Sequence, residues 1–205
     1  AYSRSYAAEG DMAYAPVIEW LQSAVLQAAL PRLTVSWRSE IARLLPQLRL
    51  QYPDLPPLPT QTETWQRQQL FEALAQAFLL AKAPLLLVID DLQWCDQETL
   101  EWLPYLLRVA GKAGLLIIGT VRSEELAEQH PLFALLLHLR IREQVTEIAV
   151  GPLDATETTE LAAQVMGQPL SATVAAQFYQ ASEGNPLFVV EMARAVASQQ
   201  LVWSD

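Results

Sequence analysis

The apolar residues of this chain follow two kinds of pattern. Residues 85–91 (LLLVIDD) and 114–123 (GLLIIGTVRS) contain continuous apolar runs, which are typical of strands buried in a parallel sheet. Residues 1–10 alternate well enough for a short strand, and residues 145–153 (VTEIAVGPL) are a further strand candidate. Segments with helical spacing lie between these runs, and strands that alternate with helices predict an α/β fold with a parallel sheet.

Helical spacing recurs in several segments between the strand candidates. It predicts helices over residues 16–30, 36–48, 62–82, 96–111 and 130–140. Pro104 is expected to disturb the fourth helix, and Gly111 is a candidate residue for its end. Residues 51–60 contain four prolines and predict an extended loop. From about Asp154 the pattern is purely helical, so residues 1–153 are predicted to form an α/β core and residues 154–205 a helical lid subdomain.

Composition and charge exclude several classes of function. Hydrophobic residues make up 52% of the 205 residues and charged residues 18%, which is a globular composition. The net charge is −10, with only two lysines, and this argues against contact with nucleic acid or an anionic membrane. No apolar run approaches the roughly 20 residues of a membrane span. A single cysteine precludes an internal disulfide and fits the reducing cytoplasm, which is the expected location.

Polar side chains follow the two strongest strand candidates directly. Asp90 and Asp91 end the first run, and Thr120 and Arg122 end the second. The carboxyl ends of parallel strands meet at one edge of a sheet, where ligands and metals bind. A carboxylate there suits water-held Mg²⁺, a second can orient or deprotonate an attacking water, and a guanidinium suits phosphate. Alternatively, the carboxylates only cap the following helix, and Arg122 only pairs with a nearby surface acid.

An ordered set of motifs gives this sequence a resemblance to a known family. The segments LLLVIDDLQWCD, GLLIIGTVRSEEL and EGNPLFVVEMAR follow YAAEGDMAYAPVIEWLQS and WQRQQLFEALAQAF, and together they span nearly the whole chain. The set resembles the STAND class of AAA-related P-loop NTPases, signalling ATPases found at the front of large LuxR-type bacterial transcription regulators. The resemblance implies a P-loop NTPase-like core, ATP and Mg²⁺ as cofactors, and a regulatory switch between attached domains.

The resemblance also implies roles for individual residues. Asp90 matches the Mg²⁺ carboxylate of the Walker B strand, Asp91 the catalytic or water-orienting acid, and Arg122 the sensor arginine. In the lid, Gly184, Asn185 and Pro186 match a nucleotide-binding motif whose proline packs on the adenine ring. The same three residues also read as a helix end followed by a helix that begins with proline. Arg194 is expected either to reach a γ-phosphate or to lie on a solvated helix face.

One part of the family's pattern is missing from this sequence. No glycine heads a G-x-x-x-x-G-K-[ST] loop, and the AGKAG segment around Lys112 is interpreted as an ordinary turn. The family's sheet has the strand order 5-1-4-3-2, and the phosphate-binding loop follows its central strand 1. We therefore expect the sequence to be an excerpt of a longer protein. In isolation the chain should show weak or no ATP hydrolysis. It should also have open strand edges, which favour self-association or binding of a partner protein.

Two histidines, Cys95 and Trp94 are further candidate residues, and two other functions fit parts of the pattern. His130 and His138 lack zinc-like partners, so surface or core positions are expected. Cys95 is expected to pack rather than react, and Trp94 either to pack or to lie near the nucleotide. The chain could instead be a non-enzymatic interaction or dimerisation scaffold. A phospho-acceptor receiver domain also uses an acidic pair, but a separate aspartate on its own strand is lacking.

Overall fold

The computed structural model describes residues 1–7, 12–58, 62–81, 84–111, 113–126 and 129–198. The chain divides into two compact units, residues 1–145 and residues 146–205. The predicted boundary lay at residue 153, just before the first helix of the second unit. The predicted turn at Lys112 and the last residues of the predicted strand 1–10 lie outside the described residues.

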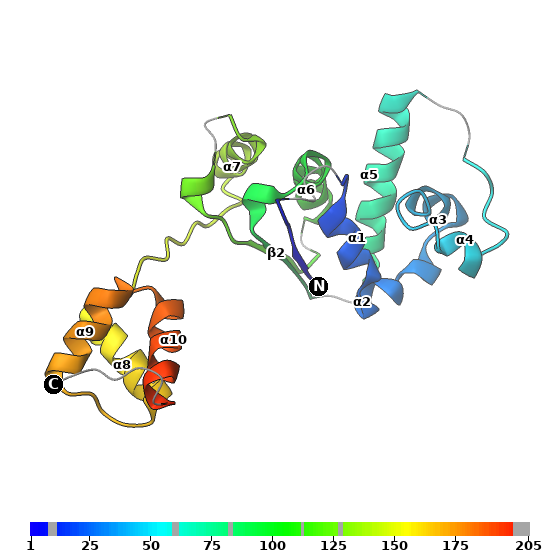
Figure 1. The fold of residues 1–205 in the computed structure, drawn as a ribbon. Helices are drawn as coiled ribbons and strands as arrows, with labels where there is room; N and C mark the ends of the chain where they lie inside the picture. The colour runs from blue at the N-terminus through cyan, green and yellow to red at the C-terminus, as the bar shows by residue number, and fades with distance from the viewer. Residues whose placement is uncertain (8–11, 59–61, 82–83, 112, 127–128, 199–205) are drawn as a thin grey trace. The chain divides into compact units, whose positions relative to one another are not determined.

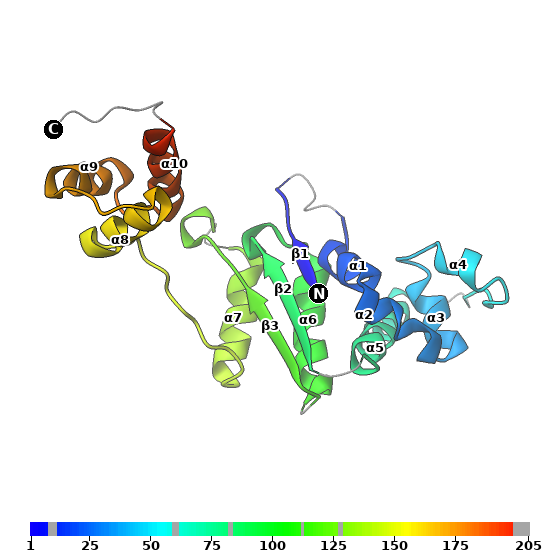
Figure 2. The same cartoon turned by 90° about the horizontal axis from the view of Figure 1, so that it is seen from below.

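The first unit is built on a parallel sheet of three strands. These are β1 (Tyr2–Arg4), β2 (Leu85–Asp90) and β3 (Leu115–Gly119), in the order β1-β2-β3. Tyr2 lies opposite Val88, and Leu85 lies opposite Leu115. Figure 2 shows the three strands side by side with their helices. The predicted α/β class with a parallel sheet is confirmed for the described residues.

The helices of the first unit include one long element, α5 (Glu63–Leu79), and several short ones. The others are α1 (Ala15–Gln22), α2 (Ala24–Gln27), α3 (Val35–Ile41), α4 (Leu48–Gln51), α6 (Gln97–Ala110), α7 (Pro131–Ile141) and the 3-10 turns η1 (Leu30–Arg32), η2 (Leu92–Trp94) and η3 (Ser123–Glu125). Trp20 and Trp102 are fully buried and both contact Phe78, with ring centroids 6.0 and 5.2 Å from it. This aromatic cluster joins α1, α5 and α6, which are neighbours in Figure 1.

The helix predicted over residues 96–111 is continuous through Pro104. The expected disturbance was wrong, because α6 runs unbroken from Gln97 to Ala110. Proline removes one N–H donor, but the flanking Trp102, Leu103 and Leu106 are all buried and keep the helix packed. Gly111 ends the helix as predicted, with a φ of 47°.

The two faces of the sheet differ sharply. Leu85, Leu87 and Ile89 are buried in one core cluster with side chains of α6 and α7, the helices that lie along one face of the sheet in Figures 1 and 2. On the opposite face, Leu86, Leu116 and Ile118 are 45%, 59% and 45% exposed. The prediction that both apolar runs are buried strands was therefore wrong for this face, which we call the open face. Side chains alternate along a strand, so each run has one covered and one uncovered row.

The strand predicted over residues 145–153 is not formed. The described residues there are extended, and Ile148 and Val150 are 83% and 92% exposed. A strand needs a neighbour that pairs with its backbone N–H and C=O groups. In the strand order 5-1-4-3-2 that the resemblance implies, this segment is the last strand, and its neighbour is strand 1. No such strand lies beside it among the described residues, so the apolar pattern alone did not produce a strand.

Over residues 146–198, the part that the structure describes, the second unit is a small bundle of three helices. They are α8 (Ala155–Met166), α9 (Ala172–Ser182) and α10 (Pro186–Ala197). Its core contains Ala162, Phe178, Val189 and Ala193, all fully buried. The helix α8 begins with a complete capping box, in which Asp154 and Glu157 each accept a hydrogen bond from the other's backbone N–H. The predicted helical character is thus confirmed for residues 154–198, and the remaining residues of that prediction lie outside the described residues.

Candidate functional site

Asp90 lies at the end of β2, at the carboxyl edge of the open face. Its Oδ1 accepts a hydrogen bond from the Thr120 hydroxyl at 2.5 Å, and its Oδ2 accepts one from the Tyr2 hydroxyl at 3.0 Å. The Thr120 hydrogen bond holds the pKa of Asp90 below its usual value, and partial burial opposes this shift. The side chain is 32% exposed. Asp90 is therefore an ionised carboxylate that solvent and ions can reach.

Asp91 sits directly beside Asp90 but in a different environment. The residue is 5% exposed and adopts the left-handed backbone conformation, with a φ of 61°. Its Oδ2 lies 3.1 Å from both Nε and Nη2 of Arg4. Its Oδ1 accepts a hydrogen bond from Gln93 at 3.2 Å and lies 3.6 Å from Nε of Arg122. Two guanidiniums and an amide thus surround this buried carboxylate.

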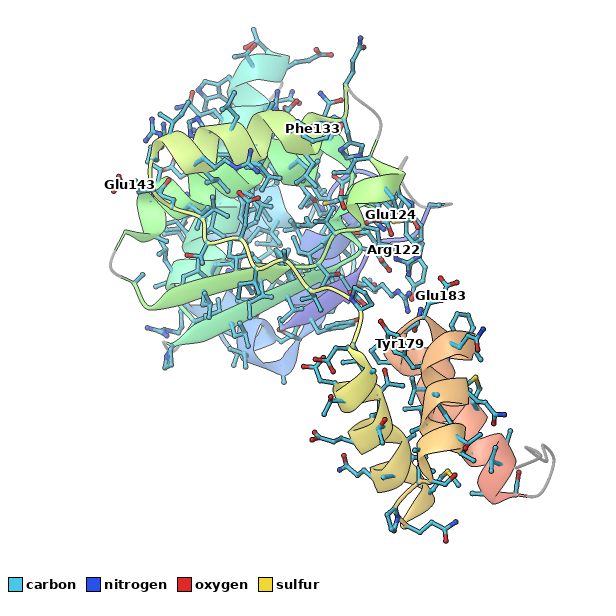
Figure 3. The ribbon with its side chains drawn as sticks, turned by 90° about the vertical axis from the view of Figure 1, so that its left-hand side faces the viewer. Arg122, Glu124, Phe133, Glu143, Tyr179 and Glu183 are labelled. Atoms are coloured by element: carbon cyan, nitrogen blue, oxygen red, sulfur yellow. The ribbon has the colours of Figure 1, made fainter. Side chains whose placement is uncertain are left out.

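Arg122 joins the site from the segment that follows β3. Its Nη1 donates to Glu125 at 2.9 Å, and its guanidinium lies 5.8 Å from the ring centroid of Trp94. Glu125 is the main cause of the raised pKa of Arg122, and Asp91 adds to it. Both interpretations of Arg122 therefore apply together, since it pairs with a surface acid and also faces Asp91. Figure 3 shows Arg122 and Glu124 at this end of the sheet.

Three residues of the site were missed by sequence reasoning, namely Tyr2, Arg4 and Gln93. Arg4 lies opposite Asp90 in the register of β1 and β2, and Tyr2 projects from the same face two residues earlier. Gln93 is 5% exposed and contacts Asp91, Glu125 and the backbone N–H of Arg122. The alternation of residues 1–10 contained a signal for Arg4, but only the pairing of β1 with β2 reveals its neighbour.

The residues predicted for nucleotide contact in the second unit have local structural roles. Gly184 has a φ of 76°, and an added Cβ would lie 2.1 Å from the backbone oxygen of Leu153. Asn185 caps α10 by accepting a hydrogen bond from the N–H of Leu187, and Pro186 begins that helix. Arg194 pairs with Glu191, one turn earlier, at 3.0 Å. These contacts match the helix-start interpretation of the motif.

Three further residues, His130, Cys95 and Asp96, lie around the site. His130 caps α7 by accepting from the N–H of Leu132, and its Nε2 lies 2.9 Å from the carbonyl of Gln93. Cys95 is buried, and burial raises the pKa of its thiol. Asp96 caps α6 by accepting from Thr99. The expectation that Cys95 packs rather than reacts agrees with this burial.

The donor set around Asp90 suits a hard cation held largely through water. Asp90 and the hydroxyl of Thr120 offer oxygen atoms, which Mg²⁺ prefers. Among the described residues there is no cluster of three or more histidine, cysteine or acidic side chains able to hold a metal alone. A cation here would therefore need ligands from water or from a bound phosphate.

Comparison with known families decides the broad class of this protein. A family model described as AAA ATPase domain matches residues 2–118, more than half of the chain. The chain belongs to the AAA ATPase domain family. The match includes β1, β2 and all of β3 except its last residue, Gly119. Searches of curated proteins and of solved structures gave no match.

Family membership gives the carboxylate pair a context. AAA ATPase domains are in general nucleotide-binding P-loop NTPase domains that use Mg²⁺, and ligands of open parallel sheets bind at the carboxyl ends of the strands. Among the described helices of this AAA ATPase domain, none combines the length and apolar character that crossing a bilayer requires.

Proposed function

We propose that this chain is the switch region of an ATP-binding and ATP-hydrolysing regulatory domain. In this role Asp90 holds Mg²⁺ through water, Asp91 orients or deprotonates the attacking water, and Arg122 senses the γ-phosphate. The observation that carries the proposal is the meeting of Asp90, Asp91 and Arg122 at one sheet edge in a chain of the AAA ATPase domain family.

The second unit would serve as the lid of this switch. Pro186 would pack on adenine, Gly184 and Asn185 would shape the turn around it, and Arg194 would reach the phosphates. The protein would then resemble the STAND-class ATPases of LuxR-type regulators, in which bound ATP changes how attached domains are displayed. The likeness of the 183–194 segment to the family's lid motif supports this assignment.

The proposed chemistry also needs a phosphate-binding loop, which the 205 residues do not contain. The open edge of β3 and the open face around Leu116 and Ile118 support a partner segment there, because they leave apolar side chains and backbone groups uncovered. A strand with its following helix, from elsewhere in a longer protein, would cover both. We expect weak or no ATP hydrolysis by the 205-residue chain without that segment.

The test compares nucleotide binding by matched variants. Calorimetry of the 205-residue chain with Mg²⁺ and a non-hydrolysable ATP analogue should give weak binding, in the high micromolar to millimolar range, that requires Mg²⁺. Asp90→Asn should abolish the Mg²⁺ requirement, whereas Asp54→Asn, in the exposed loop after α4, should change nothing. Binding that is identical in the two variants would contradict the proposal, as would efficient turnover by the unmodified chain.

The open face also supports a second candidate function, a non-enzymatic scaffold for self-association or partner docking. Exposed Leu86, Leu116 and Ile118 form an apolar strip of a kind found at protein interfaces. Sedimentation of the purified chain would separate the candidates. A stable dimer that dissociates on Ile118→Asp, together with no nucleotide binding, would favour the scaffold.

A further inference from the structure

The helices α3 and α4 carry a concentration of positive charge in an acidic chain. Residues 20–53 contain four arginines and a single acid, Glu40, whereas the whole chain has a net charge of −10. Arg43 pairs with Glu40 at 3.4 Å. Arg38 and Arg49 have no acidic partner among the residues that the structure describes. The charges of these two guanidiniums are therefore not balanced by any described carboxylate.

Arg38 is held in place by an aromatic ring rather than by an acid. Its guanidinium lies 4.5 Å from the ring centroid of Tyr52, which ends α4. Its Nε is buried and has no hydrogen-bond partner, whereas its two Nη groups are not enclosed in this way and are available as donors. Because the side chain is already ordered, binding a carboxylate costs it less conformational entropy. Arg38 is thus preorganised for an acidic partner.

Exposed apolar side chains lie beside these arginines. Leu50 is 84% exposed, and Val35 is also exposed. Val35 lies one turn before Arg38 on α3, and Arg49 lies one turn before Tyr52. Figures 1 and 2 show α3 and α4 side by side. We call these five residues the basic face. Arginine and tyrosine beside apolar side chains are typical of the residues that contribute most to binding at protein interfaces.

The three-helix unit has a surface of the opposite charge. Residues 146–205 contain seven acidic residues and one arginine. Glu183 is exposed, and its N–H donates to the carbonyl of Tyr179, which is exposed one turn earlier on α9. Leu187 and Phe188, on the first turn of α10, are exposed as well. We call these four residues the acidic face, of which Figure 3 labels Tyr179 and Glu183.

We propose that the basic face of one copy of this chain binds the acidic face of a second copy. Both halves of the interface, apolar surfaces with opposite charges, are present in the same 205 residues. The carboxylate of Glu183 takes the available donors of Arg38, and Leu50 packs against the apolar side chains of the acidic face. The two surfaces differ, so the contact is heterologous and leaves one face of each kind for further copies. It uses neither the sheet edge nor the open face and requires no nucleotide.

The charges orient this contact, and the apolar side chains add to its strength. An ion pair that stays in water contributes little. A carboxylate that pairs with Arg38 beside Leu50 loses part of its contact with water, and the attraction between the charges increases as the local dielectric constant falls. A small interface of this kind should have a Kd of about 10–100 μM and should weaken as salt is added.

Sedimentation equilibrium of the 205-residue chain, without nucleotide, tests the proposal. At low salt the weight-average mass should rise above 22.9 kDa with increasing concentration, and it should fall again in about 0.5 M NaCl. Arg38→Glu and Glu183→Arg should each weaken the association about tenfold or more, because each places like charges opposite one another. Arg108→Glu is the matched control. Arg108 lies 5.0 Å from the ring centroid of Tyr105 on α6, outside both faces, and its reversal should change nothing.

Mixing the two charge-reversed chains gives the sharpest test. The Arg38→Glu chain meets the Glu183→Arg chain with opposite charges in either pairing, so the mixture should associate nearly as well as the parent chain. Circular dichroism checks that each variant is folded. If Arg38→Glu does not fold, Arg49→Glu takes its place, because Arg49 is exposed.

The outcomes are decisive for the interface and independent of the nucleotide site. A parent chain that remains at 22.9 kDa up to about 1 mM overturns the proposal. Association that survives both charge reversals, or a mixture that associates no better than either variant alone, overturns it as well. Association lost on Ile118→Asp but kept in Arg38→Glu would assign the contact to the open face instead. Since nucleotide is absent throughout, none of these results bears on ATP binding at Asp90.

Discussion

The carboxyl edge of the sheet and the Gly184–Pro186 turn were both predicted as parts of one site, yet they are built in opposite ways. At the sheet edge, Asp91 contacts Arg4 from β1 and Arg122 from the segment after β3, which are 87 and 31 positions away along the chain. In the turn, Asn185 and Pro186 serve the helix that they begin, and Arg194 pairs within that helix.

The fold assembles the group at the sheet edge from distant segments, whereas one local segment forms the turn by itself. Charged groups drawn from distant segments into one buried cluster cost free energy to desolvate, and such clusters are concentrated at functional sites. A turn whose residues are each explained by helix capping requires no ligand to account for it. The sheet edge is therefore the stronger candidate for function, and the turn is defined first by its packing.

The largest effect is expected from Gly184→Ala. The left-handed backbone and an added Cβ only 2.1 Å from the Leu153 oxygen should together destabilise the second unit by about 3 kcal/mol or more. Urea unfolding followed by circular dichroism gives the free energy. Gly167→Ala is the matched control, since Gly167 has a φ of 71° but open space around it, and it should cost only about 1 kcal/mol. Equal costs would contradict the packing role of Gly184.

A smaller effect is expected at Asp91. Asp91→Asn keeps a residue that tolerates the left-handed backbone but removes the charge between Arg4 and Arg122, and it should lower the free energy of unfolding by about 2 kcal/mol. Asp90→Asn, at a far more exposed carboxylate, should cost less than about 1 kcal/mol. The reverse order in urea unfolding would show that the guanidiniums do not stabilise Asp91.

The pH dependence of stability gives a subtler test at Asp90. Folding lowers the pKa of this carboxyl from its ordinary value of 3.8, so its contribution is present above that value and is lost as the pH falls through the folded pKa. The difference in unfolding free energy between the parent chain and Asp90→Asn should be constant above about pH 5 and should shrink at lower pH. A difference that grows on acidification would reverse the sign of the shift.

The smallest effect is expected at Cys95, which lies in the same turn as the acidic pair. Because the thiol is buried and its pKa is raised, it should not react with a disulfide reagent in the folded chain. One thiol per chain should react after unfolding in urea. Rapid reaction of the native protein, measured by absorbance at neutral pH, would show that this turn opens.

The sequence supported the outline of the fold to different degrees in different places. The α5 and α6 helices and the β2 and β3 strands were located because their apolar periodicity is strong and local. The helix predicted over residues 16–30 is divided into α1, α2 and η1, since a periodic pattern does not specify where a short helix breaks. Residues 145–153 had the composition of a strand but no neighbouring strand to pair with.

The sequence by itself determined the helix caps, the runs that became β2 and β3, and the acids and arginine that follow them, because neighbours along the chain control these features. Only the tertiary structure decided which face of the sheet is covered, that Asp90 is open while Asp91 is enclosed, and that Arg4 shares their site. Strand pairing brings Tyr2 and Arg4 beside a segment more than eighty residues away, and such contacts depend on register, which no local pattern encodes.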